Sequence, residues 1–207
     1  MINYMHTDIT DFPGGGNRMA LTSWDEEWYE EYMEDVRIAR MEIENMKLYP
    51  SEALICDMYA LPSHNFQTYY AMLYEHHGRW EMVYAKPQIY RYQYAEPVKM
   101  YSFSTSRKVQ EHFGDGRIII GIRHLPDEFV KMVKNIIENL PDNHVLGEGV
   151  MGIDGALQAI RVFDGDTVVK EVVYYLADMV PLKDQKEWMT KQLEELYLLV
   201  GKMIQGT

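Results

Sequence analysis

Residues 53–103 constrain the fold most, because their composition suits β-strands and turns better than helices. Tyrosines and β-branched residues, which strands favour, are interrupted by short polar or proline-containing segments. Residues 66–74 and 80–84 flank the polar turn His76-His77-Gly78-Arg79, in which Gly78 can adopt a positive φ. The stretch therefore predicts several antiparallel strands, with a hairpin among them.

A further strand is expected at residues 89–94, where alternation places three tyrosines on one face, namely Tyr90, Tyr92 and Tyr94. Pro87 and Pro97 flank this stretch, and proline favours edge strands. Two roles stay open for the tyrosine row: it packs into the core, or it is exposed and contacts a partner or a flat ligand. An edge strand would also allow a homo-oligomer through pairing with its symmetry mate.

Three segments carry apolar residues at helical spacing. The first follows a capping box formed by Ser23 and Glu26, and it predicts a long N-terminal helix. The second begins at Pro126 and the third follows Pro181. With the strands, these segments predict an α+β fold, in which a mainly antiparallel sheet is covered by the N-terminal, the middle and the C-terminal helix. Residues 117–122 are apolar on both faces, so we expect a central strand there.

The domain organisation is expected to be simple, because the chain has no internal repeat, no low-complexity linker and no sharp break in composition. Residues 1–22 contain Pro13-Gly14-Gly15-Gly16 and lack apolar periodicity, which predicts a flexible N-terminal arm. Residues 23–207 are expected to form a single α+β domain, and a hydrophobic content of 47% is sufficient for its core.

The charge balance favours some partners over others. Twenty Lys and Arg against 32 Asp and Glu give a net charge of −12, which repels nucleic acid and anionic membrane surfaces. We therefore expect neither nucleic acid nor a membrane as a partner, and a basic protein is the better match. Glu30, Glu31 and Glu34 on the first helix are candidate contacts, although the helix dipole and a solvated face also favour acids there.

Cys56 is the only cysteine, which excludes an intramolecular disulfide and a cysteine-rich metal cluster and agrees with a reducing compartment. Its neighbours form an apolar strand pattern, so we expect a buried thiol. The N-terminal residues do not resemble a signal peptide, and no apolar run approaches the roughly 20 residues of a membrane helix. A cytoplasmic location is expected.

One formal motif occurs, G-x-G-x-x-G at Gly147, Gly149 and Gly152. A dinucleotide loop of this kind lies between a strand and a helix, whereas this stretch follows a predicted helix and precedes predicted strands. The later motifs of a kinase are missing as well. We interpret the stretch as a flexible joint before a hairpin that turns at Asp164-Gly165-Asp166.

Patterns that would indicate catalysis or metal binding are weak. Adjacent histidines such as His76 and His77 chelate a metal poorly, and no nucleophile motif occurs. We therefore predict no metal site and no cofactor, and the sequence identifies no catalytic residue.

The leading hypothesis is a non-enzymatic interaction module, an adaptor or an antitoxin- or immunity-like neutraliser, that binds a protein through an acidic, tyrosine-containing surface. The alternative is an enzyme or a small-ligand-binding protein. Its pocket would lie between the sheet and the helices, near His144, Glu148 and Asp154.

Overall fold

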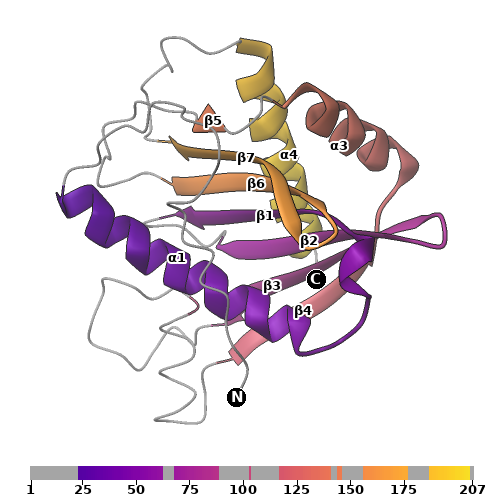
Figure 1. Cartoon of the computed structure of the whole chain (residues 1–207), viewed down its shortest axis with the longest axis horizontal. Helices are drawn as coiled ribbons and strands as arrows, with labels where there is room; N and C mark the ends of the chain where they lie inside the picture. Colours follow the sequence, from indigo (N-terminus) through magenta and orange to yellow (C-terminus); the bar gives the residue numbers. More distant parts are fainter. Residues whose placement is uncertain are drawn as a thin grey trace.

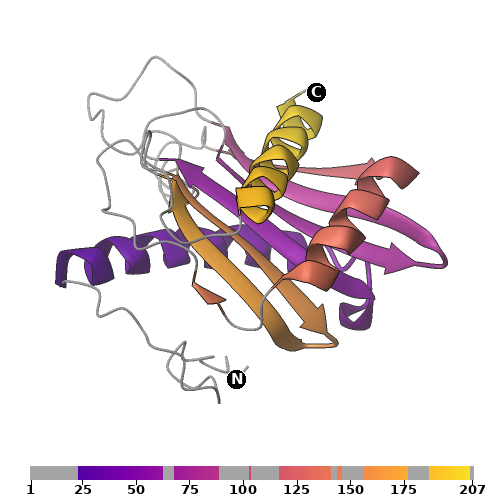
Figure 2. The ribbon, with the colours of Figure 1, turned by 90° about the horizontal axis from the view of Figure 1, so that it is seen from above.

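The computed structural model describes residues 23–62, 68–88, 103, 117–140, 144–145, 156–176 and 187–205. These residues form one twisted sheet with helices on both of its faces (Figures 1 and 2). Within the first helix, the burial of side chains is described from Met33 onward. Residues 1–22 lie outside the description, so the division into an arm and one domain stays a prediction.

The sheet has seven strands in the described part of the chain, in the order β4-β3-β2-β1-β6-β7-β5. Their bounds are β1 Leu54–Pro62, β2 Tyr69–His76, β3 Arg79–Gln88, β4 Arg117–His124, β5 His144–Val145, β6 Ala156–Asp164 and β7 Thr167–Leu176. Neighbouring strands pair antiparallel except β5, a two-residue strand that pairs parallel with β7. The prediction of a mainly antiparallel sheet is confirmed.

Two tight turns join neighbouring strands, as the sequence predicts. The β2–β3 hairpin turns at His77 and Gly78, with φ of 53° and 73°, and the β6–β7 hairpin turns at Gly165, with φ of 59°. Left-handed backbone at these positions matches the twist of the flanking strands, and glycine adopts it without steric cost.

The described helices are α1 Ser23–Glu44, α3 Asp127–Asn139 and α4 Glu187–Gln205, and a short 3-10 turn, η1 Ser51–Ala53, precedes β1. Helix α1 crosses one face of the sheet, while α3 and α4 cover the other (Figure 2). The α+β class is thereby confirmed, with a helix in each of the three predicted places. The expected length of α1 is supported by side-chain packing only over residues 33–44, and the part before Met33 stays a prediction.

The sheet separates the core into two apolar layers because alternate strand residues point to opposite faces. The layer under α1 joins Val36, Ala39 and Ile43 of the helix to Tyr59, Tyr70, Met72, Tyr74, Val83 and Ala85 of the strands. The other layer joins Phe129, Val133 and Ile136 of α3 and Leu193, Leu196 and Val200 of α4 to Cys56, Met58, Tyr69, Leu73, Met82 and Tyr84. The expected burial of the Cys56 thiol is confirmed, and burial raises the pKa of that thiol well above its ordinary value.

The expectation that residues 117–122 form a central strand is wrong. Strand β4 comes first in the sheet order, and within the described residues no strand pairs with its outer edge. Its apolar residues have another cause, because Ile118 and Ile120 pack against the layer under α1. On the opposite face, the ring of Tyr84 lies directly over Gly121, where a Cβ would overlap it.

Two lysines from the sheet hold the C-terminal ends of helices. Lys170 of β7 donates hydrogen bonds from Nζ to the carbonyl oxygens of Ile137 and Leu140 at the end of α3, at 3.1 and 3.0 Å. Lys86 of β3 donates one to the carbonyl of Ile204 near the end of α4, at 3.1 Å. Each ammonium donates to the carbonyl end of its helix and opposes the negative end of the helix dipole.

Candidate functional site

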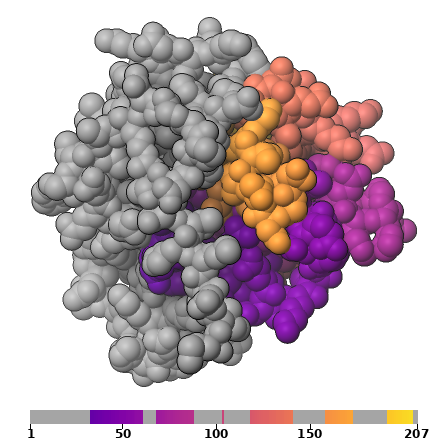
Figure 3. Space-filling view, viewed as in Figure 1, coloured from indigo at the N-terminus to yellow at the C-terminus, as the bar shows by residue number. Residues whose placement is uncertain are grey.

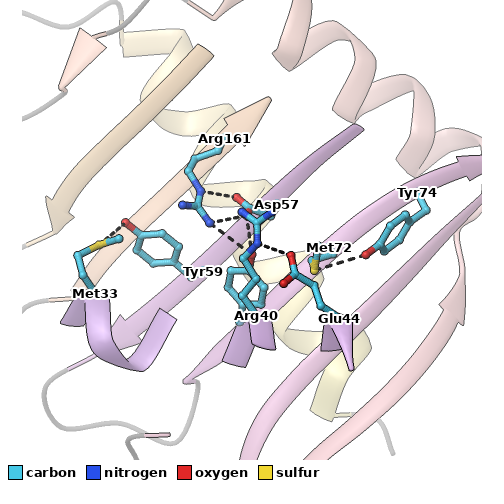
Figure 4. A network of polar contacts seen from close by, with 9 residues as sticks. Met33, Arg40, Glu44, Asp57, Tyr59, Met72, Tyr74 and Arg161 are labelled. Atoms are coloured by element: carbon cyan, nitrogen blue, oxygen red, sulfur yellow. Dashed lines mark hydrogen bonds and ion pairs between the residues drawn. The ribbon is translucent and has the colours of Figure 1, made fainter. Parts of the chain in front are cut away.

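A buried ion pair lies between the sheet and α1. Asp57 of β1 is fully buried and faces α1, although its neighbours along the strand are apolar. Arg161 lies directly opposite on β6 and donates to both carboxylate oxygens of Asp57, from Nε at 2.8 Å and from Nη2 at 2.5 Å (Figure 4). This two-point geometry is the strongest form of an arginine–carboxylate contact, and it fixes both side chains.

Two further side chains complete the contacts of this pair. The hydroxyl of Tyr70, on β2, donates to Asp57 Oδ2 at 2.5 Å and accepts a longer hydrogen bond of 3.3 Å from Arg161. Arg40 of α1 places Nη1 3.9 Å from Asp57 Oδ2 and donates from Nε to Glu44 at 2.6 Å (Figure 4). The network therefore ties α1 to three strands of the sheet.

The pKa values in this network reflect burial and the neighbouring charges. Burial raises the pKa of Tyr70 well above its ordinary value, and the charge of Asp57 adds to that effect. Burial acts against the charged form of Arg161, but Asp57 and Tyr70 outweigh it, so its pKa is raised. Glu171, the partner of Arg161 across β6 and β7, also has a raised pKa because burial outweighs the attraction of Arg161. These groups are held by one another, so we assign the network to the attachment of α1.

A cleft of about 250 Å³ lies beside this network, at the C-terminal end of α1. Its apolar residues are Ile43, Leu48, Leu54, Met72 and Val83, and all of them except the exposed Leu48 are buried. Its polar residues come from α1, from the segment that leads to β1, from β2 and from the β6–β7 turn, and they include Arg40, Glu44, Lys47, Tyr49, Ser51, Tyr74 and Asp166. Figure 3 shows this part of the surface, where the β6–β7 hairpin (orange) lies beside the purple segment after α1.

The tyrosines of the cleft form a stacked pair. The rings of Tyr49 and Tyr74 have their centroids 4.8 Å apart at an interplanar angle of 30°. The hydroxyl of Tyr49 donates a short hydrogen bond to the carboxylate of Glu81, which raises the pKa of Tyr49 to about 12. Burial raises the pKa of Tyr74 to about 12 as well. Both phenols therefore stay neutral at physiological pH.

The chain reaches Tyr49 through a tight turn that ends α1. The amide of Asn45 still bonds to the carbonyl of Met41, as in an α-helix, and the amide of Lys47 bonds to the carbonyl of Glu44 at 3.0 Å. Lys47 has a φ of 49°, a left-handed conformation that is common where a helix ends. This turn brings the segment after α1 back over the sheet.

Most of the side chains selected from the sequence lie outside the described residues. This holds for Tyr90, Tyr92, Tyr94, Glu148 and Asp154, and for the side chains of Glu30, Glu31 and His144. The backbone of His144 belongs to β5 and lies opposite Val172. Glu34 makes an ion pair of 2.7 Å with Arg37 along the exposed side of α1, which is the ordinary behaviour of a surface glutamate.

The cleft residues were not selected from the sequence. Tyr49 follows the first helix, and Asp166 was assigned to a turn. They meet through the fold, because the cleft draws on segments from residue 40 to residue 166. No local spacing of residue types would have identified them.

The described residues offer neither a candidate metal cluster nor a candidate membrane span. No group of three or more His, Cys, Asp or Glu side chains there is arranged to hold a metal ion. None of the described helices is long and apolar enough to cross a membrane.

The chain was compared with known proteins. No protein-family model, no curated protein and no solved structure matches the chain.

Proposed function

We propose that this protein is a non-enzymatic interaction module, an adaptor or an antitoxin- or immunity-like neutraliser, that binds a basic protein partner. The observation that carries the proposal is the cleft at the end of α1, which combines stacked tyrosines with exposed carboxylates. Glu44 and Asp166 line it, and the exposed residues Glu52 and Asp164 adjoin its lining in the sequence.

The surroundings of the cleft resemble the organisation of protein interfaces. Such interfaces have an aromatic or apolar centre and a polar rim, and they are enriched in tyrosine and methionine. Next to Tyr49, the side chains of Met46 and Leu48 are 52% and 39% exposed. Covering apolar side chains of this size with a partner removes them from water and lowers the free energy of the complex.

Electrostatics supports a basic partner. The net charge of −12 attracts a cationic protein over long range and speeds its association, and this effect weakens as salt is added. A cytoplasmic setting belongs to the same proposal and agrees with the single, buried thiol of Cys56.

Affinity capture with the full-length chain tests this proposal. We expect one partner to be recovered in a stoichiometric amount, to have a basic isoelectric point and to bind the purified protein more weakly as salt increases. Glu52→Lys combined with Asp166→Lys should weaken binding. Glu194→Lys combined with Glu195→Lys on α4 is the matched control, because both residues are exposed and lie on the opposite layer. The proposal fails if no stoichiometric partner is found, or if both double variants bind equally well.

A second candidate function, the binding of a small ligand, is favoured by the same cleft. The cleft lies between the sheet and a helix, as the alternative hypothesis requires, but its described lining does not include His144. Screening of small fragments by chemical-shift perturbation tests this candidate. Shifts at amides far from the cleft, or none at all, would exclude the cleft as the ligand site.

A further inference from the structure

We infer that the cleft at the C-terminal end of α1 receives the side chain of one lysine or arginine of the partner. This inference rests on the proposed function and specifies the chemistry of its contact.

The size of the cleft suits a single side chain. Its volume of about 250 Å³ is below the roughly 300–1,000 Å³ typical of pockets for drug-sized ligands. A partner that inserts one long side chain would fill such a space, and anchors of this kind dominate the binding energy of many interfaces.

The distribution of polarity selects an amphipathic occupant. Ile43, Leu54 and Val83 are 2%, 5% and 0% exposed, so the base of the cleft is apolar. The carboxylate of Asp166 is exposed at the side formed by the β6–β7 turn. Lysine and arginine match this arrangement, because their methylene stems pack on apolar surface while their charged heads stay near water.

The field of the whole chain, whose net charge is −12, favours a cation over an anion at the cleft. Of the four charged residues that line the cleft, Arg40 and Glu44 pair with each other at 2.6 Å, which leaves Lys47 and Asp166 as opposite charges at the rim. The helix dipole places negative potential at the carbonyl end of α1. The last turn of α1 contains no basic residue that would offset it. Lys47 and Asp166 are both exposed and solvated, so solvent screens the repulsion by Lys47 and the attraction by Asp166 alike.

An aromatic surface adds to this preference. The ring of Tyr49 is partly exposed beside the cleft, and its hydroxyl is held by Glu81, so the ring has a fixed orientation. A cation over the face of a tyrosine ring is attracted by the π electrons. The ring of Tyr49 and the carboxylate of Asp166 both line the cleft, and each attracts a guanidinium or ammonium group at the rim.

Chemical-shift titration of the full chain with small probes tests the inference. The probes are N-acetyl-arginine amide, the uncharged N-acetyl-norleucine amide and the acidic N-acetyl-glutamate amide. We expect the arginine probe to bind best and to shift the amide signals of Ser51 and Gly165, which line the cleft. The inference is overturned if the glutamate or the norleucine probe binds as well as the arginine probe, or if no probe shifts these signals.

Two exposed substitutions give the sign of the charge that binds. Asp166→Asn should weaken binding of the arginine probe about two- to fivefold and Lys47→Met should strengthen it by a similar factor, as expected for exposed charges. Asp127→Asn on α3 is the control and should change nothing. The opposite signs at Asp166 and Lys47 would show an anion site and overturn the inference.

The two proposals fail in different ways. In one outcome, affinity capture finds a basic partner whose affinity is the same for the wild type and for the Asp166→Asn and Lys47→Met variants. In that case the inference about the cleft is wrong while the proposed function stands. If the arginine probe binds as expected and no protein partner exists, the proposed function is wrong and the specificity of the cleft stands.

Discussion

Replacing Asp57 by alanine is expected to destabilise the protein by about 3–5 kcal/mol, the usual cost of breaking a buried ion pair by removing one partner. The structure supports this range, since Asp57 is 0% exposed and the side chain of Arg161 is only 12% exposed. The variant leaves the guanidinium without its carboxylate and the buried hydroxyl of Tyr70 without its acceptor. A domain is commonly stable by only about 5–15 kcal/mol, so the variant would lie near the limit of folding.

Urea unfolding followed by tryptophan fluorescence measures this effect, and the dependence of the unfolding free energy on urea should keep its slope. Two controls separate the charge from the loss of atoms. Asp57→Leu combined with Arg161→Met should recover most of the stability, because an apolar pair of similar volume often equals a buried ion pair. Asp164→Ala, at an exposed carboxylate on the same strand as Arg161, should cost less than about 0.5 kcal/mol. Exposed ion pairs contribute less than about 1 kcal/mol, so a cost below that value for Asp57→Ala would refute the conclusion that this pair behaves as a buried one.

Three other substitutions test separate features by thermal or urea unfolding. Gly121→Ala should cost about 1–3 kcal/mol because its Cβ overlaps the ring of Tyr84, and the cost should shrink in a Tyr84→Leu background. Lys170→Met should cost about 0.5–1.5 kcal/mol by removing the hydrogen bonds to the end of α3, and an unchanged stability would show that water replaces them. Glu171→Gln should stabilise the protein at pH 7, because burial raises the pKa of this carboxyl and its ionised form is therefore less stable in the folded state. The gain should disappear below the unfolded pKa of about 4.3, and a gain that persists at low pH would contradict the assignment.

The parts of the fold that the sequence predicts are those with local causes. Gly78 marks the β2–β3 hairpin because a left-handed turn residue must lie there, and Pro126 marks the start of α3. In α3, Phe129, Val133 and Ile136 recur at helical spacing and are the buried residues of that helix. Each of these signals is contained in a few neighbouring residues.

The position of β4 in the sheet could not be read from its residues. An apolar strand is expected at the centre of a sheet, because both of its faces are then covered. In this fold Ile118 and Ile120 pack against the layer under α1, even though the outer edge of β4 pairs with no described strand. Whether the faces of a strand are buried and whether its edges are paired are independent properties. Only the burial of the faces changes the hydrophobic pattern of the sequence.

The ion pair and the cleft could not be predicted from the sequence for a related reason. Asp57 and Arg161 are 104 residues apart in the chain, and no local pattern joins them. A single acid within an apolar strand was the only signal available for Asp57, and a charged residue of this kind is almost never fully buried unless it is paired. The stacking of Tyr49 on Tyr74 likewise depends on how the chain returns after α1.

The lysines that hold the ends of α3 and α4 bear on the order in which the protein assembles. Lys170 is about 30 residues after the end of α3, so during synthesis α3 leaves the ribosome before β7 can supply its ammonium. For α4 the order is reversed, since Lys86 precedes Ile204 by 118 residues and is synthesised before the last helix. Contacts this distant in sequence close late and slow folding, because chain entropy must be lost before they form. The final turns of both helices should therefore become ordered only when the sheet is complete, which makes helix and sheet formation one cooperative event.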